Sequence, residues 1–346
     1  METDAVEVRY ARTTDGVDVA YQVVGAGPVV VWLPSLSHVR LQWRVPALRR
    51  AYEHLARHVT LVLYDARGTG SSDRRAGPED LALDAQLRDL EAVLDAVGPC
   101  RAHLFGYYHS VAAALAFAAA HPERVGHLLL FGGAARMRDA MGPAQTQALL
   151  SLVGQDWDLF ADTAARTWLG WDAGENGPRV ADVFRAATTP AFAAQFFAAA
   201  ARLDVSDVLP RVVAPALVLH RQGAAQIPAD VSRGLAARLP HGRFLELPGA
   251  TPTIFLEESA GDLELVTRWF VDGEVTAPAP ARDGALTPRE GDVLRLLAAG
   301  DSNAQIARAL GIAEHTVERH AANLYRKIGA RGRADATAWA IRHGRA

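Results

Sequence analysis

Short, almost wholly apolar runs recur along the first three-quarters of this sequence, at residues 29–33, 59–64, 100–105, 125–131, 216–220 and 243–247. Segments with a helical pattern separate most of them, such as LALDAQLRDLEAVLDAVG from residue 81. Apolar strands that alternate with helices are typical of a largely parallel sheet covered on both faces. The sequence therefore predicts an α/β fold, preceded by a hairpin of residues 6–12 and 17–24.

Residues 137 to about 205 interrupt this alternation, because they contain helical patterns and no convincing strand. We expect them to form a helical cap over one end of the sheet. Aromatic side chains are frequent here and either form the core of the cap or roof a cavity beneath it. They are Trp157, Phe160, Trp168, Trp171, Phe184, Phe192, Phe196 and Phe197.

The composition changes at DGEVTAPAPARDGA, residues 272–285, which has no periodicity and predicts a linker. We therefore divide the chain into a large domain (1–272), a linker (273–285) and a small, all-helical domain (286–346). From Leu286 onward there are 10 basic and 6 acidic residues, a net charge of +4, whereas the rest of the chain carries −7. This asymmetry favours a polyanionic partner for the small domain.

The small domain reads as four helices, and the middle two have the spacing of a helix-turn-helix. Ser302 can cap the second helix, which Gly311 ends. Ala307 stands where two helices would cross closely, and Val317 and Leu324 would point the next helix's apolar side into the core.

The segments LTPRE, SNAQIA and TVERHAANLYRKIG extend this pattern, and residues 286–344 resemble a LuxR/GerE-type DNA-binding domain. The resemblance implies that the third helix enters the major groove of DNA. Residues at base edges would then be Glu318, Arg319, Ala322 and Asn323. Residues placed for phosphate would be Ser302, Thr316, Arg326 and Lys327.

Two further expectations follow from this resemblance. Family members often have a lysine at the position of Glu318, so the base preference of this chain is expected to differ. Such modules usually dimerise through the fourth helix, here around Ala334, Ala338 and Trp339. A two-fold symmetric homodimer predicts an operator in double-stranded DNA that is an inverted repeat.

The large domain resembles the α/β-hydrolase fold, through YQVVGAGPVVVWLPS, LYDARGTGSSD, HPERV and VVAPALVLH. Its resemblance is greatest to hydrolase-like domains joined to regulatory modules. A hydrolase of this fold needs a nucleophile at a sharp strand-to-helix turn, an acid after a later strand and a histidine after the last strand. This sequence has Tyr108, Ala224 and Pro252 at those positions. We therefore expect the large domain to have the α/β-hydrolase fold without hydrolase activity, and to contain no catalytic residue.

A second register of the same turn remains open, with Ser110 of YHSVA as the nucleophile. Tyr108 and Ala112 would then flank it, although the strained turn favours small residues there. The missing histidine would have to be recruited from elsewhere, from His38, His109, His220 or His241.

We expect a cavity above the carboxyl ends of the strands to be present even though the catalytic groups are missing. Tyr108 would project into it, and the backbone N–H groups of Leu36 and His109 would remain as donors to an oxygen atom. We expect a small, partly apolar ligand. The expected ligand-binding residues are Ser35, Leu36, His38, Trp43, Tyr107, Tyr108, His109, Trp168, Trp171 and Phe197.

These observations lead to the hypothesis of a ligand-responsive transcriptional regulator. The alternatives are an esterase-like regulator with a rearranged site, and a ligand-free regulator that uses the large domain as a dimerisation scaffold. We expect no cofactor and no metal, because no metal-ligand cluster or phosphate-cradling loop is present in the sequence. One cysteine, no export signal and no apolar run long enough for a bilayer favour a cytoplasmic protein that joins the nucleoid when bound to DNA, with no membrane partner.

Overall fold

The computed structural model describes residues 6–74, 77–98, 101–142, 144–169, 176–224, 227–249, 253–255, 260–275, 286, 288–328 and 330–342. Their contacts divide the described residues into two compact units, one that extends to residue 275 and one that starts at residue 286. Each unit is described by itself.

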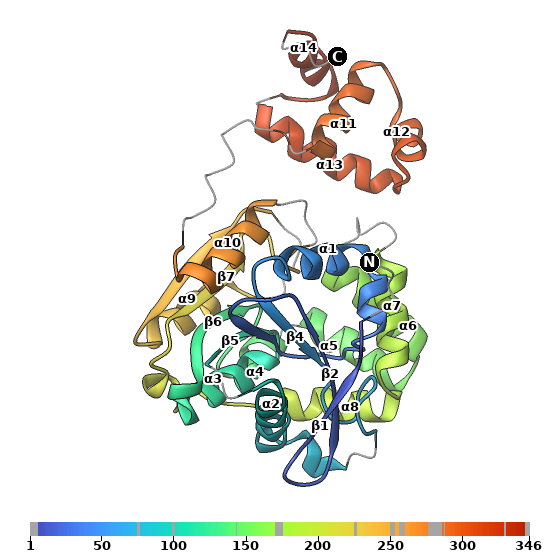
Figure 1. Ribbon diagram of the computed structural model, residues 1–346. Coiled ribbons are helices and arrows are strands. Elements are labelled where there is room, and N and C mark those ends of the chain that lie inside the picture. Colours follow the sequence, from blue (N-terminus) through green and yellow to red (C-terminus); the bar gives the residue numbers. More distant parts are fainter. Residues whose placement is uncertain are drawn as a thin grey trace. The chain divides into compact units, whose positions relative to one another are not determined.

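The large unit contains one eight-stranded sheet, and every strand expected from the sequence is present (Figure 1). The sheet order is β1-β2-β4-β3-β5-β6-β7-β8, with antiparallel pairing at β1-β2 and β2-β4 and parallel pairing from β4 onward. The strands are β1 (Arg9–Arg12), β2 (Asp18–Val24), β3 (Val29–Trp32), β4 (Thr60–Tyr64), β5 (Ala102–Tyr107), β6 (Val125–Phe131), β7 (Ala216–Arg221) and β8 (Gly242–Leu247).

Helices cover both faces of the sheet, as the apolar strands predicted. Successive strand residues alternate between two buried clusters, so Leu104 belongs to one and Phe105 to the other. The first cluster contains residues of α2 (Leu83–Val97), α3 (Ser110–Ala120) and α9 (Ala229–Arg238). The second contains residues of α1 (Pro46–Leu55) and α10 (Ala260–Asp272).

The helical cap is also present at residues 137–200, and its helices between residues 157 and 200 lie on the same side of the sheet (Figure 1). Aromatic packing holds it together, because the ring of Phe160 lies 5.2 Å from that of Trp157 and 5.7 Å from that of Phe197. The helices are α4 (Met137–Met141), α5 (Ala144–Ser151), α6 (Trp157–Leu169), α7 (Asn176–Ala187) and α8 (Pro190–Ala200).

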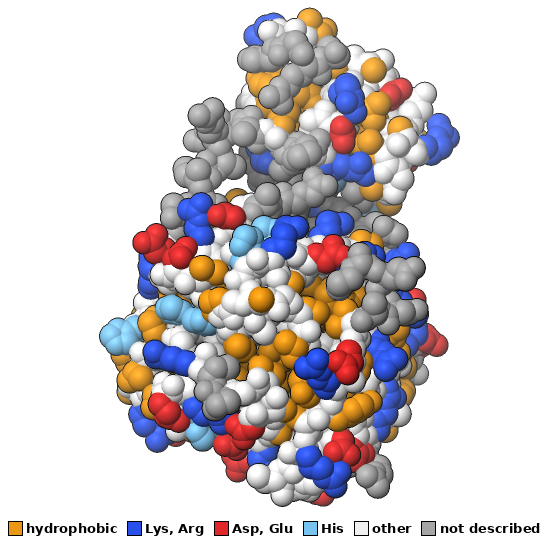
Figure 2. All heavy atoms as spheres, in the orientation of Figure 1, with side chains coloured by type: hydrophobic (Ala, Val, Ile, Leu, Met, Phe, Trp, Pro, Cys, Tyr) orange, Lys and Arg blue, Asp and Glu red, His pale blue; other side chains and the backbone are white. Residues whose placement is uncertain are grey.

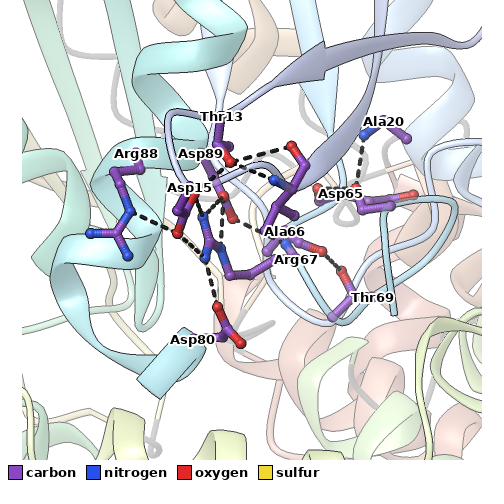
Figure 3. Close-up of polar contacts among 12 residues, drawn as sticks. Thr13, Asp15, Ala20, Asp65, Ala66, Arg67, Thr69, Asp80, Arg88 and Asp89 are labelled. Carbon is purple, nitrogen blue, oxygen red and sulfur yellow. Dashed lines mark hydrogen bonds and ion pairs between the residues drawn. The ribbon is translucent and has the colours of Figure 1, made fainter. Parts of the chain in front are cut away.

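The loop after β4 is fixed by one buried arginine. The guanidinium of Arg67 lies between the carboxylates of Asp15, Asp80 and Asp89, at 2.8, 2.7 and 2.8 Å (Figure 3). These carboxylates come from the β1-β2 turn, from a 3-10 turn (Pro78–Leu81) and from α2. Arg67 holds the pKa of Asp15 well below its ordinary value. A cation with three anions from separate segments locks the loop relative to the sheet.

The same loop anchors the cap. The N–H of Gly70 donates to the carbonyl of Ala187 at 2.7 Å, and the hydroxyl of Thr188 donates to the carbonyl of Gly68 at 3.1 Å. Gly68 has a φ of +77°, and a Cβ there would lie 2.2 Å from the ring of Phe192. Glycine is required because α8 packs directly onto the backbone.

The small unit consists of α11 (Pro288–Ala298), α12 (Asn303–Leu310), α13 (Glu314–Ile328) and α14 (Arg333–Arg342) around its own buried core. Ser302 caps α12, because its side chain accepts from the N–H of Gln305 while Gln305 reaches back to the N–H of Ser302. Gly311 ends α12 with a φ of +65°. The helix-turn-helix predicted from the sequence is therefore present.

Candidate functional site

The sharp turn after β5 retains the backbone of a nucleophile elbow, although its side chain is a tyrosine. Tyr108 has a φ of +52°, a strained conformation for a residue with a Cβ. The turn is crowded, because a Cβ on Gly106 would lie 3.0 Å from the Cα of Val111 and one on Gly133 would lie 2.3 Å from the carbonyl oxygen of Tyr108. The α/β-hydrolase elbow thus persists with a phenol at its tip.

Ser110, the nucleophile of the second register, serves a different purpose. Its hydroxyl donates to the carbonyl of Tyr107 at 2.8 Å and accepts from the N–H of the same residue at 2.9 Å. The serine is 3% exposed at the start of α3 and does not line the cavity described below. Its hydroxyl closes the turn locally, so this geometry does not support a nucleophilic Ser110.

The hydroxyl of Tyr107 connects the elbow to the segment after β8. It donates to the hydroxyl oxygen of Thr253 at 3.0 Å and is also hydrogen-bonded to the side chain of Tyr108. Burial raises the pKa of both phenols above the ordinary value, so both are neutral near pH 7. A chain of neutral hydroxyl groups therefore crosses the region in which a hydrolase holds its triad.

The acid position is occupied by a residue that cannot ionise. Ala224 follows β7, and its N–H closes a turn onto the carbonyl of Arg221 at 3.0 Å. The third position, Pro252, lies outside the described residues. Arg221, the last residue of β7, has a fully buried side chain. It donates to Asp262 of α10 and to the carbonyl of Pro248.

A cavity of about 110 Å³ lies at the carboxyl ends of β3, β4 and β5, beneath the cap helix α7. This is the position that the sequence predicted. The volume is smaller than the roughly 300–1,000 Å³ of common ligand pockets, because aromatic side chains occupy much of the space. Its lining consists of Trp32, Leu33, Pro34, Ser35, Leu36, Ser37, Gln42, Leu48, Tyr52, Leu63, Tyr64, Tyr107, Tyr108, Val180, Val183, Phe184, Thr253 and Ile254.

Of the ten expected ligand-binding residues, the structure brings four together around this cavity: Ser35, Leu36, Tyr107 and Tyr108. Trp171 lies outside the described residues, as does the side chain of Trp168 in α6. The cap wall is formed instead by Val180, Val183 and Phe184 of α7. Their spacing is that of one helix face, so the apolar periodicity of this segment was the sequence signal for them.

The other four expected residues do not line the cavity. Trp43 is buried against Tyr52 and donates its indole N–H to Gln22 at 2.9 Å. His109 is packed against Phe196, with the rings 4.6 Å apart, and burial lowers its pKa to about 4. Phe197 belongs to the aromatic core of the cap. The elbow and the cap each needed these apolar surfaces for their own packing.

His38, the fourth expected ligand-binding residue that does not line the cavity, lies beside a buried carboxylate. Asp65, at the end of β4, accepts hydrogen bonds from the N–H groups of Val39 and Ser71 and from the hydroxyl of Ser37 at 3.0 Å. Burial raises the pKa of Asp65, and burial also lowers that of His38. Asp65 thus fixes the loop that carries the cavity residues Ser35 and Leu36, without lining the cavity itself.

In the small unit, one face of α13 packs into the core and the opposite face is exposed. Val317, Ala321 and Leu324 point into its core, whereas Glu318, Arg319 and Ala322 are exposed and Asn323 is half-buried. The expected base-contacting residues therefore lie on the side of the helix opposite to the core. A helix with an exposed polar face of this kind has the dimensions that the major groove of DNA admits.

The expected phosphate-contacting residues have different surroundings. Ser302 is engaged in the cap of α12. Lys327 donates to Glu290 of α11 at 2.7 Å, and the side chain of Glu290 is only 4% exposed. Thr316 is 1% exposed, and its hydroxyl has no hydrogen-bond partner in the described structure. The side chain of Arg326 lies outside the described residues. Lys327 thus has a structural role that the sequence pattern did not indicate.

Charge is distributed differently in the two units. On the face of the large unit seen in Figure 2, acidic and basic side chains are interspersed, whereas the segment from Leu286 onward carries a net positive charge. Among the described residues, no cluster of three or more His, Cys, Asp or Glu side chains is placed to hold a metal ion. In the same part of the chain, no helix combines the length and apolarity needed to cross a bilayer.

Comparison with known families agrees with both units. The family model of the alpha/beta hydrolase fold matches residues 28–259, and that of the luxR family of bacterial regulatory proteins matches residues 284–340.

Individual relatives match one part of the chain each. The 2-hydroxy-6-oxononadienedioate/2-hydroxy-6-oxononatrienedioate hydrolase of Paraburkholderia phymatum is 30% identical over 155 residues, 44% of this chain and 54% of that protein. The transcriptional regulatory protein MctR of Rhizobium johnstonii is 48% identical over 59 residues, 17% of this chain and 28% of that protein. The chain spans about a quarter to a half of the length of such curated relatives. The solved esterase of Exiguobacterium antarcticum has a TM-score of 0.65 and 18% identity, over 76% of this chain and 99% of its own.

Proposed function

We propose a function for a chain that belongs to the α/β-hydrolase fold family and carries a DNA-binding domain of the bacterial luxR regulators. In this proposal, the hydrolase-fold domain binds a small molecule without converting it, and this binding controls transcription. One observation carries the proposal. A neutral, half-buried tyrosine occupies the strained tip of the elbow and forms part of the wall of the cavity beneath the cap. A small cavity therefore lies beside the position at which a hydrolase of this fold carries its nucleophile.

Absence of catalysis is the first part of this proposal. A triad needs a nucleophile, an imidazole base and an acid that orients the base. The described positions hold Tyr108 and Ala224, and Ser110 is occupied by the backbone of Tyr107. A neutral phenol is a poor nucleophile, because nucleophiles of this kind react after a base has removed their proton. A bound molecule would leave this site unchanged.

DNA recognition is the second part. We place the exposed face of α13, with Glu318, Arg319 and Ala322, in the major groove. The small unit would pair with a second copy through α14, on which Ala334, Ala338 and the 63% exposed Ile341 follow one helical face. A homodimer of this kind reads an inverted repeat. Under this proposal, the protein acts in the cytoplasm, where it meets its DNA partner.

Control of DNA binding requires that the ligand bind two states of the dimer with different affinities. The experiment uses the full-length protein and an operator selected from random DNA. We expect the operator Kd, measured by fluorescence anisotropy at fixed salt, to change in the presence of a small-molecule extract. Tyr108→Ala should alter that response, and Tyr10→Ala, an exposed tyrosine of β1, should not. An operator Kd that no extract fraction changes, together with equal behaviour of both variants, would favour the scaffold alternative.

A further inference from the structure

We propose that the ligand of the cavity is an uncharged molecule about the size of one five- or six-membered ring, with an oxygen atom that accepts a hydrogen bond. This inference rests on the proposed function and specifies the chemistry of the same site. It combines three properties of the cavity as the described residues form it: its volume, the absence of charge from its lining, and two hydrogen-bond donors without an acceptor among those residues.

Volume sets the upper limit on the size of the ligand. A cavity of about 110 Å³ is somewhat smaller than an engineered cavity of about 150 Å³ that accommodates benzene. Tyr108 limits the space on the side of the elbow, and Val183 and Phe184 limit it on the side of the cap. Val183 and Phe184 are 4% and 6% exposed and Tyr108 is half-buried, so these walls leave room for no more than a single small ring.

Charge sets the second limit. No Asp, Glu, His, Lys or Arg side chain is among the described residues that line the cavity. Its ionisable groups are the phenols of Tyr52, Tyr64, Tyr107 and Tyr108, and burial raises the pKa of each. An ion bound here would lose its hydration without gaining a counter-ion in the wall, which is strongly unfavourable.

The third property of the cavity is the presence of two hydrogen-bond donors in its wall that have no acceptor among the described residues. Tyr52 donates to the side-chain oxygen of Gln42 at 3.1 Å, which leaves the NH₂ group of Gln42 without an acceptor in the described structure. The hydroxyl of Ser35 has no partner there either. By contrast, Tyr107 already donates to Thr253. A carbonyl, ether or hydroxyl oxygen on the ligand would satisfy Ser35 or Gln42, and a bare hydrocarbon would satisfy neither.

The test compares three compounds that share one ring and differ in charge: cyclohexanone, cyclohexanecarboxylate and cyclohexylammonium. Their dissociation constants are measured on the full-length protein by ligand-observed NMR titration at pH 7.5. We expect cyclohexanone to bind at least tenfold more tightly than either ion. Val183→Trp, which fills the cavity from the cap, should abolish binding. Ser35→Ala should weaken it about 2- to 10-fold, whereas Ser151→Ala, a serine on the cap surface, should leave it unchanged.

Three results would overturn the inference: an ion that binds as tightly as cyclohexanone and is lost in Val183→Trp, cyclohexanone binding that Val183→Trp does not affect, or no binding of any of the three. Operator affinity measured in parallel separates this inference from the proposed function. Cyclohexanone that binds in the cavity without changing operator affinity would support the ligand class and contradict the regulatory role. An ion that binds in the cavity and changes operator affinity would support the regulatory role and contradict the uncharged ligand class.

Discussion

Arg221 at the end of β7 forms a fully buried ion pair with Asp262 of α10, 41 residues later in the chain. The pair lies next to the position where a hydrolase of this fold would carry its catalytic acid. Arg221 also donates to the carbonyl of Pro248 at 2.9 Å, at the start of the segment that would carry the catalytic histidine. Arg221 thus ties the end of β7 both to α10 and to the segment after β8.

Removal of one partner of this pair should destabilise the large unit strongly. Arg221→Met leaves the carboxylate of Asp262 buried without a counter-ion, which typically costs about 3–5 kcal/mol. The free energy of unfolding by urea measures this loss. Arg221→Met combined with Asp262→Leu should recover a large part of the stability, because no charge remains buried. A double variant that is as unstable as the sum of the two single variants would contradict this explanation.

Restoring a serine at the elbow should not restore hydrolysis. In Tyr108→Ser the new hydroxyl has no base, because Ala224 cannot orient an imidazole and Ser110 stays bonded to Tyr107. We expect p-nitrophenyl acetate turnover by wild type and variant to equal the rate without protein. Turnover by the wild type that Ser110→Ala abolishes and Tyr108→Phe preserves would instead establish the second register of the turn.

Acidification should weaken the large unit through His109. Burial lowers the pKa of His109 to about 4 in the folded state, whereas an unfolded histidine has a pKa of about 6.5. The unfolded state therefore binds more protons between these values, and stability falls as the pH falls from 6.5 towards 4. Between pH 7.5 and 5.0 this group should account for about 2 kcal/mol of lost stability. His109→Phe, which keeps a ring against Phe196, should remove this part of the pH dependence; an unchanged slope would show that His109 is not the group responsible.

Substitutions at Lys327 and Arg319 should distinguish a loss of stability of the small unit from a loss of DNA binding. Lys327→Met removes the ion pair between Lys327 and the nearly buried Glu290, so the small unit should lose about 1–3 kcal/mol of stability. Arg319→Ala should weaken operator binding by about 1–3 kcal/mol and should affect thermal unfolding less than Lys327→Met does. Unfolding by circular dichroism and operator titrations at several salt concentrations measure the two effects. A salt slope reduced by about one in Lys327→Met would show that Lys327 also contacts phosphate.

The sequence by itself determined the elements and their order. Apolar runs, helical periodicity and glycines at tight turns are local signals, so all eight strands, the cap and the helix-turn-helix were predicted from them. The same was true of the elbow, where Gly106 and the spacing to HPERV identified Tyr108 without any tertiary information.

Tertiary structure alone decided which side chains meet. Val183 of α7 forms the cap wall, His109 packs under Phe196, and Lys327 pairs with Glu290 over a separation of 37 residues. A periodic pattern shows that a side chain faces inward, and it does not show what that side chain contacts. Contacts between distant segments depend on how helices and strands pack, which no local pattern of residues specifies. The small volume of the cavity and the absence of charge from its described lining were therefore visible only in the folded chain.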